Sequence, residues 1–186
     1  MEVSGGYKLQ PGDRAPDFNL PGYHSGREAT FTLSDFAGSR ALVVAFWCNH
    51  CPYVRSYERR FVEWADEART RGVAVVAICS NDETNYPDDD YPHMVQRARE
   101  QGYNFPYLRD RDQAVAHRYG AQCTPHFLVF DQDLRLRYQG RFDDDREGKN
   151  VKQRYLPDAV DALLAGRAPP TPQSWAIGCS IKWSAA

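Results

Sequence analysis

The sequence has no long hydrophobic run and no excess of charge of one sign, and each absence removes a class of function. The longest apolar stretches, residues 41–47 and 73–79, are far shorter than the roughly 18 residues that a membrane span needs. The 23 basic and 25 acidic side chains give a net charge of -2, which provides no positive field for nucleic acid or anionic lipid. We therefore expect no nucleic-acid partner and no membrane partner.

Cysteine is scarce, and no leader pattern is evident. The first twelve residues contain no cationic segment followed by an apolar stretch, so we expect no secretory signal and a cytoplasmic protein. Five cysteines, an odd number in a chain of 186 residues, do not resemble an extracellular disulfide framework. In a reducing compartment these thiols need an explanation in chemistry or in packing.

The remaining pattern alternates between strand-like and helix-like segments. Residues 41–47 and 73–79 are apolar runs of strand length, and apolar residues recur at helical spacing between them, from Pro52 to Gly72. A strand, a helix and a strand in this order are typical of a right-handed parallel crossover in an α/β fold. We also expect short strands or a hairpin within residues 7–26, helices near 93–101, 113–119 and 155–165, and strands at 127–130 and 136–139.

The chain is predicted to form one domain over residues 1–166. Residues 167–186 form a Pro-rich and aromatic tail. Because a free tail seldom carries several large apolar side chains, we expect this tail to pack back on the domain.

Cys48 and Cys51 form a CxxC pair directly after the first apolar strand and directly before the helix. Proline is tolerated in a helix only in the first turn, so Pro52 places the helix start at the cysteine pair. Free N–H groups and the positive end of the helix dipole favour a thiolate there. We predict that Cys48 is the nucleophile and that Cys51 resolves the mixed disulfide. His50, between them, is predicted to stabilise the Cys48 thiolate and thereby to raise the reduction potential.

Other uses of the pair remain open. A structural zinc site would need a second cysteine pair or suitably spaced histidines, and the remaining three cysteines stand alone in the sequence. Copper could be held by Cys48, Cys51 and a distant histidine such as His126, which would make the protein a binding module rather than an enzyme. We assign no cofactor and no metal.

Three segments together resemble a known family. These are WCNHCPYV at 47–54, CTP at 123–125 and GCSIKW at 178–183. They are similar to the thioredoxin-fold group often called peroxiredoxin-like or thiol-disulfide isomerase and thioredoxin-like. With GDRAPDF at 12–18, the resemblance covers nearly the whole chain.

The resemblance implies a thioredoxin-like fold, in which a central mixed sheet is flanked by helices and carries an N-terminal hairpin and a C-terminal extension. It also implies that Thr124 and Pro125 form a loop opposite the cysteines, with Pro125 in cis. In such proteins this loop offers backbone groups to an extended substrate chain. Thr124, Pro125 and the neighbouring Trp47 are therefore the expected substrate contacts.

The sequence departs from two better-known patterns. Thioredoxins have a buried aspartate six residues before the first cysteine, where this chain has Leu42, so no carboxylate base is evident for Cys51. Peroxiredoxins have a proline and a hydroxyl residue seven and three positions before the reactive cysteine, where this chain has Val44 and Cys48. The alternative of a peroxiredoxin-like hydroperoxide reductase is thus the weaker one.

The function predicted from the sequence is a thiol-disulfide oxidoreductase. Its substrates would be protein or small-molecule disulfides, and its electrons would come from a thiol or a reductase. Cys79, Cys123 and Cys179 are expected to be packing residues, with a third redox role left open for Cys179. The acidic run at residues 88–90 is interpreted as a solvated loop.

Overall fold

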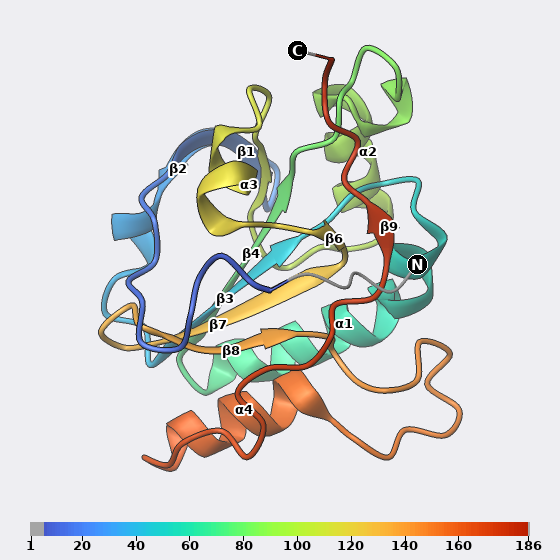
Figure 1. Cartoon of the computed structure of the whole chain (residues 1–186). Coiled ribbons are helices and arrows are strands. Elements are labelled where there is room, and N and C mark those ends of the chain that lie inside the picture. Colours follow the sequence, from blue (N-terminus) through green and yellow to red (C-terminus); the bar gives the residue numbers. More distant parts are fainter. Residues whose placement is uncertain (1–5, 186) are drawn as a thin grey trace.

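The part of the chain that the structure describes, residues 6–185 of a computed structural model, is built around a seven-stranded sheet (Figure 1). The strand order is β2-β1-β5-β4-β3-β7-β8. These strands are β1 (Asn19–His24), β2 (Arg27–Thr32), β3 (Ala41–Phe46), β4 (Val73–Cys79), β5 (Tyr107–Arg109), β7 (His126–Asp131) and β8 (Leu136–Gly140). A separate two-stranded sheet pairs β6 (Cys123–Thr124) with β9 (Cys179–Ser180). The central mixed sheet is the one predicted.

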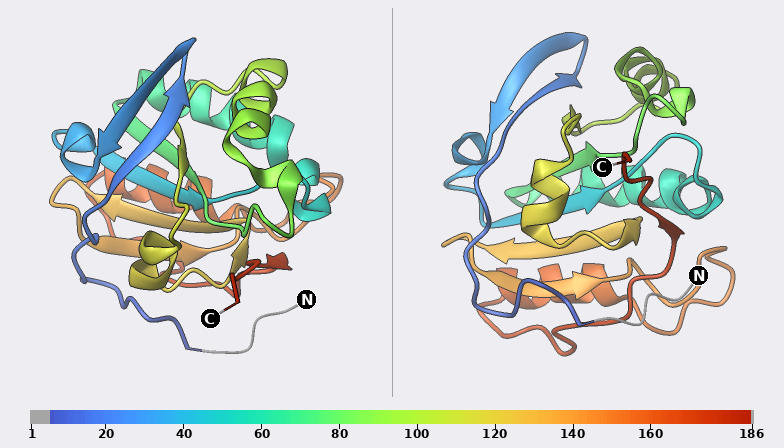
Figure 2. Two further views of the ribbon diagram at one scale, coloured as in Figure 1. Left: turned by 90° about the horizontal axis from the view of Figure 1, so that it is seen from above. Right: turned by 45° about the horizontal axis from the view of Figure 1, so that its top comes forward.

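The helices cover both faces of the sheet, as Figure 2 shows. They are α1 (Pro52–Thr70), α2 (Tyr91–Glu100), α3 (Ala114–Tyr119) and α4 (Tyr155–Leu164), with the short 3-10 turns η1 (Leu33–Phe36) and η2 (Pro87–Asp89). One core cluster joins α1, α2 and α4 to one face of the sheet. The other cluster joins α3, the N-terminal segment and η1 to the opposite face. Among the described helices, none is both long and apolar enough to cross a membrane.

Strand β3 lies at the centre because both of its faces are apolar. Alternate side chains of a strand point to opposite faces, and here both sets are fully buried. Ala41, Val43 and Ala45 join the first core cluster, whereas the other three residues join the second. The continuous apolar run in the sequence is therefore explained by two-sided burial.

The register of β3 positions the candidate site. β3 runs parallel to β4 and antiparallel to β7, with Phe46 opposite His126. Cys48 follows Phe46 by two residues, and Thr124 precedes His126 by two residues. The sheet therefore brings the cysteine loop and the Thr124-Pro125 loop to the same edge.

Several elements differ from the expectations. The N-terminal hairpin lies later than expected, because its strands β1 and β2 pair around a turn at Ser25 and Gly26. Strand β5 and the pair of β6 with β9 were not predicted at all. The expected elements at 41–47, 73–79 and 155–165 are present with ends shifted by no more than one residue.

Candidate active site

The cysteine loop is held by hydrogen bonds to Asn49. The backbone N–H of Asn49 donates to Asp89 Oδ1 (2.7 Å), and its side-chain oxygen accepts from the Tyr107 hydroxyl (2.8 Å). Arg55 on α1 donates to the Asn49 carbonyl (3.0 Å). The loop is thus tied to β5, to α1 and to the segment before α2, which limits how far its two sulfurs can move.

Cys51 is the residue that caps helix α1. Pro52 is the first helical residue, and Cys51 precedes it with an extended backbone (φ -66°, ψ 125°). A hydrogen bond from the Cys48 thiol lowers the pKa of Cys51 most, and the thiol of Cys179 and the amides of Val54 and Cys179 lower it further, to about 4. The thiolate of the pair therefore resides on Cys51.

The pKa of Cys48 moves in the opposite direction. Its side chain is fully buried, as is that of Cys51, and its sulfur lies 3.3 Å from the Thr124 hydroxyl oxygen. Burial raises the pKa of Cys48 well above the ordinary value, and the hydrogen bond to Cys51 and the charge of Asp89 raise it further. The sequence predicted the favoured thiolate at Cys48, whereas helix α1 begins directly after Cys51, so its N-terminus favours a thiolate at Cys51.

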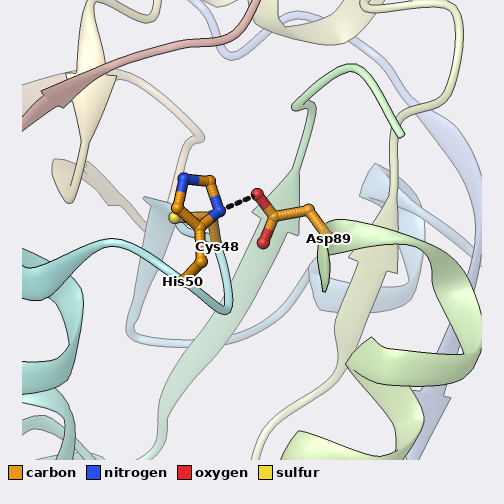
Figure 3. A group of neighbouring side chains, drawn as sticks. All are labelled: Cys48, His50 and Asp89. Atoms are coloured by element: carbon orange, nitrogen blue, oxygen red, sulfur yellow. Dashed lines mark ion pairs between the residues drawn. The ribbon is translucent and has the colours of Figure 1, made fainter. Parts of the chain in front are cut away.

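A buried carboxylate lies beside Cys48 (Figure 3). Asp89 is fully buried at the end of η2, and its Oδ2 atom forms an ion pair with His50 Nδ1 at 2.5 Å. His50 is one-quarter exposed and stacks on Tyr86, with ring centroids 5.6 Å apart. The sequence suggested that His50 acts on the Cys48 sulfur alone. In the structure its imidazole faces the Asp89 carboxylate.

Sequence reasoning missed Asp89. It belongs to the acidic run at residues 88–90, which was interpreted as a solvated loop. Asp88 is indeed exposed, and Asp90 caps α2 by accepting a hydrogen bond from His93 N. Only the middle residue turns inward, and three identical letters contain no signal that distinguishes it.

Cys48, His50 and Asp89 also form a candidate metal site. One ligand atom each of Cys48, His50 and Asp89 lies within 4.8 Å of the others, and such a mixed sulfur, nitrogen and oxygen set suits zinc. Both Asp89 oxygens already have partners, because Oδ1 accepts from Asn49 N and Oδ2 accepts from Asn81 (2.8 Å). Hydrogen bonds therefore already hold the Asp89 carboxylate in place within this group.

The copper set suggested by the sequence does not assemble. His126 is fully buried, packs against the tilted ring of Tyr7 with centroids 5.1 Å apart, and accepts a hydrogen bond from Gln122 N at Nδ1. Burial lowers the pKa of His126 to about 3. Among residues 6–185, the group that could hold a metal ion beside Cys48 contains His50 and Asp89, and it does not contain His126.

The Thr124-Pro125 bond is cis, as the resemblance implied. The Cys51 sulfur lies 3.3 Å from the Thr124 carbonyl oxygen, so both cysteines contact this one residue. Thr124 and Pro125 are nevertheless buried. The chain's own strand β9 lies over the edge that was expected to face a substrate.

Trp47 is also buried, which corrects its expected place on the substrate surface. Its indole N–H donates to the Tyr103 hydroxyl (2.9 Å), which donates in turn to Glu58 (2.5 Å). Glu58 is paired with Arg97 on α2. Trp47 therefore anchors the start of the cysteine loop to α1 and α2.

The other cysteines divide into two groups. Cys79 and Cys123 are fully buried, as predicted for packing residues, and burial raises the pKa of each to about 12. Cys179 is only half-buried, and its sulfur lies 2.6 Å from the Cys51 sulfur. The contact joins residues 128 positions apart, and the sequence contained no signal for it beyond the presence of a cysteine in the tail.

A mixed sheet, a CxxC pair at a helix N-terminus and a cis-proline loop opposite it define a thioredoxin-fold redox protein. The AhpC/TSA family model matches residues 11–139, which is well over half of the chain. The chain belongs to the AhpC/TSA family.

Similar proteins support this assignment. A selenocysteine-containing peroxiredoxin of Peptoclostridium acidaminophilum is 29% identical over 141 residues, which is 74% of this chain and 63% of that protein. The chain thus spans less than two-thirds of the length of that relative. An uncharacterized conserved protein of Geobacillus kaustophilus is 42% identical with a TM-score of 0.90, covering 97% of this chain and 96% of that one.

A hypothetical protein of Sinorhizobium meliloti 1021 is 43% identical with a TM-score of 0.89, covering 96% of this chain and 97% of that one. The peroxidoxin BcpB of Mycobacterium tuberculosis shares the fold, with a TM-score of 0.62 at 19% identity, covering 85% of this chain and 97% of that one.

Proposed function

We propose that the protein is a thiol-disulfide oxidoreductase whose redox pair is Cys48 and Cys51. The observation that carries this proposal is the placement of the two cysteines: both sulfurs lie 3.3 Å from oxygen atoms of Thr124, and Cys51 caps helix α1. In this arrangement hydrogen bonds lower the pKa of Cys51, and burial raises that of Cys48. Such a pair provides one sulfur that attacks and a second that stays protonated until it is needed. In the sequence-based scheme Cys48 attacked first, whereas the geometry favours Cys51.

The proposed reaction has two steps. The Cys51 thiolate attacks one sulfur of a substrate disulfide, forming a mixed disulfide and releasing the first substrate thiolate. Cys48 then loses its proton and attacks the Cys51 sulfur, forming the Cys48–Cys51 disulfide and releasing the second substrate thiolate. The substrate gains two electrons and leaves as two thiolates, of which one takes up the proton lost by Cys48 and the other a proton from water, and the two cysteines of the protein are oxidised.

Asp89 and His50 provide the base for the second step. Their ligand atoms lie within 4.8 Å of the Cys48 sulfur, whereas the position at which thioredoxins have a buried aspartate is Leu42 in this chain. The neutral imidazole of His50 can accept the Cys48 proton, because the Asp89 carboxylate beside it stabilises the imidazolium that forms. We thus assign to this pair the role that the sequence left unfilled.

The proposed substrates are protein or small-molecule disulfides, and the proposed electron donor is a thiol or a reductase. A cytoplasmic location suits such a cycle, because a reducing compartment returns the Cys48–Cys51 disulfide to the dithiol. The five cysteines are free in the structure.

The test is insulin disulfide reduction with dithiothreitol as donor, using the wild type and three serine variants. We expect Cys51→Ser and Cys48→Ser each to lose at least ~100-fold in rate, because a redox pair does not turn over with one sulfur. Cys79→Ser is the matched control, since Cys79 is a buried cysteine outside the pair. Unchanged insulin reduction by Cys51→Ser would refute the proposal.

A second candidate function is hydroperoxide reduction. It is favoured by the position of Cys51, which caps a helix that begins with Pro52, and by the family. In this reaction the Cys51 thiolate attacks a peroxide oxygen, giving an alcohol or water and a Cys51 sulfenic acid. Cys48 then condenses with the sulfenic acid, giving the Cys48–Cys51 disulfide and water.

Both candidates begin at Cys51, so cysteine variants alone do not separate them. Hydrogen peroxide consumption must be measured beside insulin reduction at equal substrate concentration. Among the described residues, no arginine is recorded in contact with the Cys51 sulfur, so we expect peroxide consumption to be the slower reaction. Faster, Cys51-dependent consumption of peroxide would assign the second function instead.

A further inference from the structure

The C-terminal tail crosses the redox site and is anchored on both sides of it. Upstream, Ser174 N donates to the Gln139 carbonyl (3.0 Å), and Ala176 N donates to the Tyr7 hydroxyl (2.8 Å). Downstream, Lys182 N donates to the Asn81 side chain (2.9 Å). The four residues before Lys182 are thereby held against the loop that contains Thr124 (Figure 1).

The tail binds this loop as a strand. β9 pairs with β6 in an antiparallel arrangement, with Cys179 opposite Thr124. Pairing of an extended segment with an exposed strand edge is a common way of recognising a peptide. Cys179 thus lies where the cysteine of an extended disulfide substrate would have to lie in order to meet the redox pair.

The sulfur of Cys179 is positioned for exchange. It lies 2.6 Å from the Cys51 sulfur, and it is the one thiol of this group that is not fully buried. Burial and the hydrogen bond to Cys51 raise the pKa of Cys179 to about 11. These contacts favour a protonated Cys179 beside the Cys51 thiolate in the reduced protein.

The close approach of the tail depends on Gly178. A Cβ atom at this position would lie 2.1 Å from the Thr124 carbonyl oxygen and 3.1 Å from Pro125 N. These are backbone atoms, which cannot move aside as a flexible side chain could. A methyl group at Gly178 would therefore push β9 away from β6 without changing any thiol.

We propose that Cys179 is a third redox cysteine, which strand β9 holds in the place of a substrate cysteine and which forms a disulfide with Cys51. This inference rests on the proposed function, because it needs a mixed disulfide at Cys51. In the step, the Cys179 sulfur attacks the Cys51 sulfur of that mixed disulfide, the Cys51–Cys179 bond forms, and the substrate leaves as a thiol that takes up the Cys179 proton. Cys48 can then displace Cys179, which returns the tail thiol and leaves the Cys48–Cys51 disulfide.

The experiment uses glutathione disulfide with three full-length variants: Cys48→Ser, Cys48→Ser/Cys179→Ser, and Cys48→Ser/Gly178→Ala. We expect Cys48→Ser to lose two thiols without retaining glutathione, and peptide mapping to join Cys51 to Cys179. The variant that also lacks Cys179 should keep one glutathione on Cys51. The variant with alanine at Gly178 retains both thiols, and its glutathione adduct should last at least several-fold longer than that of Cys48→Ser.

Three results would overturn the inference. If Cys48→Ser retains glutathione on Cys51 as stably as the variant without Cys179, Cys179 takes no part, and the proposed function still stands. If the Gly178→Ala substitution leaves the lifetime of the adduct unchanged, strand β9 does not position Cys179 for the exchange. If no variant forms either an adduct or a disulfide at Cys51, the proposed function fails as well.

Discussion

Cys51 and Cys48 lie three residues apart on one loop, yet their surroundings act on a thiol in opposite ways. Around Cys51 are hydrogen-bond donors: two thiols and the amides of Val54 and Cys179. Cys48 is as fully buried as Cys51, but burial raises its pKa, and the hydrogen bond to Cys51 and the negative charge of Asp89 raise it further. The CxxC spacing therefore identifies a redox pair, but the start of the helix and the fold of the neighbouring loop decide which sulfur is ionised.

The largest expected contrast is in the pH dependence of alkylation. In Cys48→Ser, iodoacetamide should modify Cys51 at a rate that is nearly constant from pH 5 to 8, because a thiol with a pKa of about 4 is already ionised throughout this range. In Cys51→Ser, modification of Cys48 should rise about tenfold per pH unit across the same range, because its pKa lies above it. Mass spectrometry of the two peptides measures both rates.

A second variant at the same position is the control for this contrast. Cys48→Ser keeps a hydrogen-bond donor for Cys51, whereas Cys48→Ala removes it. A hydrogen bond to a charged group contributes about 1.5–3 kcal/mol, so the pKa of Cys51 should be about one to two units higher in Cys48→Ala. Identical pH profiles for serine and alanine would show that Cys48 is not the group that stabilises the thiolate.

A smaller change is expected from Asp89→Asn. Removal of the negative charge should lower the pKa of Cys48 by about one unit, which the pH profile of Cys48 alkylation in a Cys51→Ser background measures. The lost acceptor for Asn49 or Asn81 should also decrease the free energy of unfolding by about 1–3 kcal/mol, measured in urea.

Asp88→Asn is the matched control, because it makes the same change at the exposed neighbour. We expect it to leave both the Cys48 profile and the unfolding free energy unchanged. Equal effects of the two substitutions would mean that the negative charge of Asp89 does not raise the pKa of Cys48.

The smallest effect is expected from Thr124→Val. The substitution removes the hydroxyl that contacts the Cys48 sulfur, while the carbonyl that contacts Cys51 stays. A hydrogen bond of about 1 kcal/mol corresponds to less than one pKa unit, so the pKa of Cys48 should rise slightly and that of Cys51 should not change. Ultraviolet thiolate absorbance measures both, and Thr124→Ser, which keeps the hydroxyl, should match the wild type.

The framework of the site could be predicted from the sequence because its signals are local. The two-sided burial of β3 is visible as six consecutive apolar residues, and Pro52 marks the first turn of α1. The same proline could also have predicted that Cys51, and not Cys48, caps the helix. Proline is favoured at the first helical position, and the residue directly before that position is the cap.

The remainder of the site depends on contacts that no local pattern encodes. Strands β6 and β9 have two residues each, too few for any periodicity, and they pair across more than fifty positions. Asp89 turns inward because Asn49, His50 and Asn81 surround it, and these come from two other segments, the cysteine loop and the loop after β4. Long-range pairing of short segments is therefore what the sequence could not provide.

The chain of hydrogen bonds from Trp47 through Tyr103 to Glu58 has a practical consequence. It fixes a water-shielded indole immediately beside the cysteine loop, whereas Trp175 and Trp183 are substantially exposed. Because the indole of Trp47 is buried and directly precedes Cys48, we expect its fluorescence to change when the cysteine pair is oxidised. Trp64 is also buried, so a Trp47→Phe variant would identify the share of the signal that comes from Trp47.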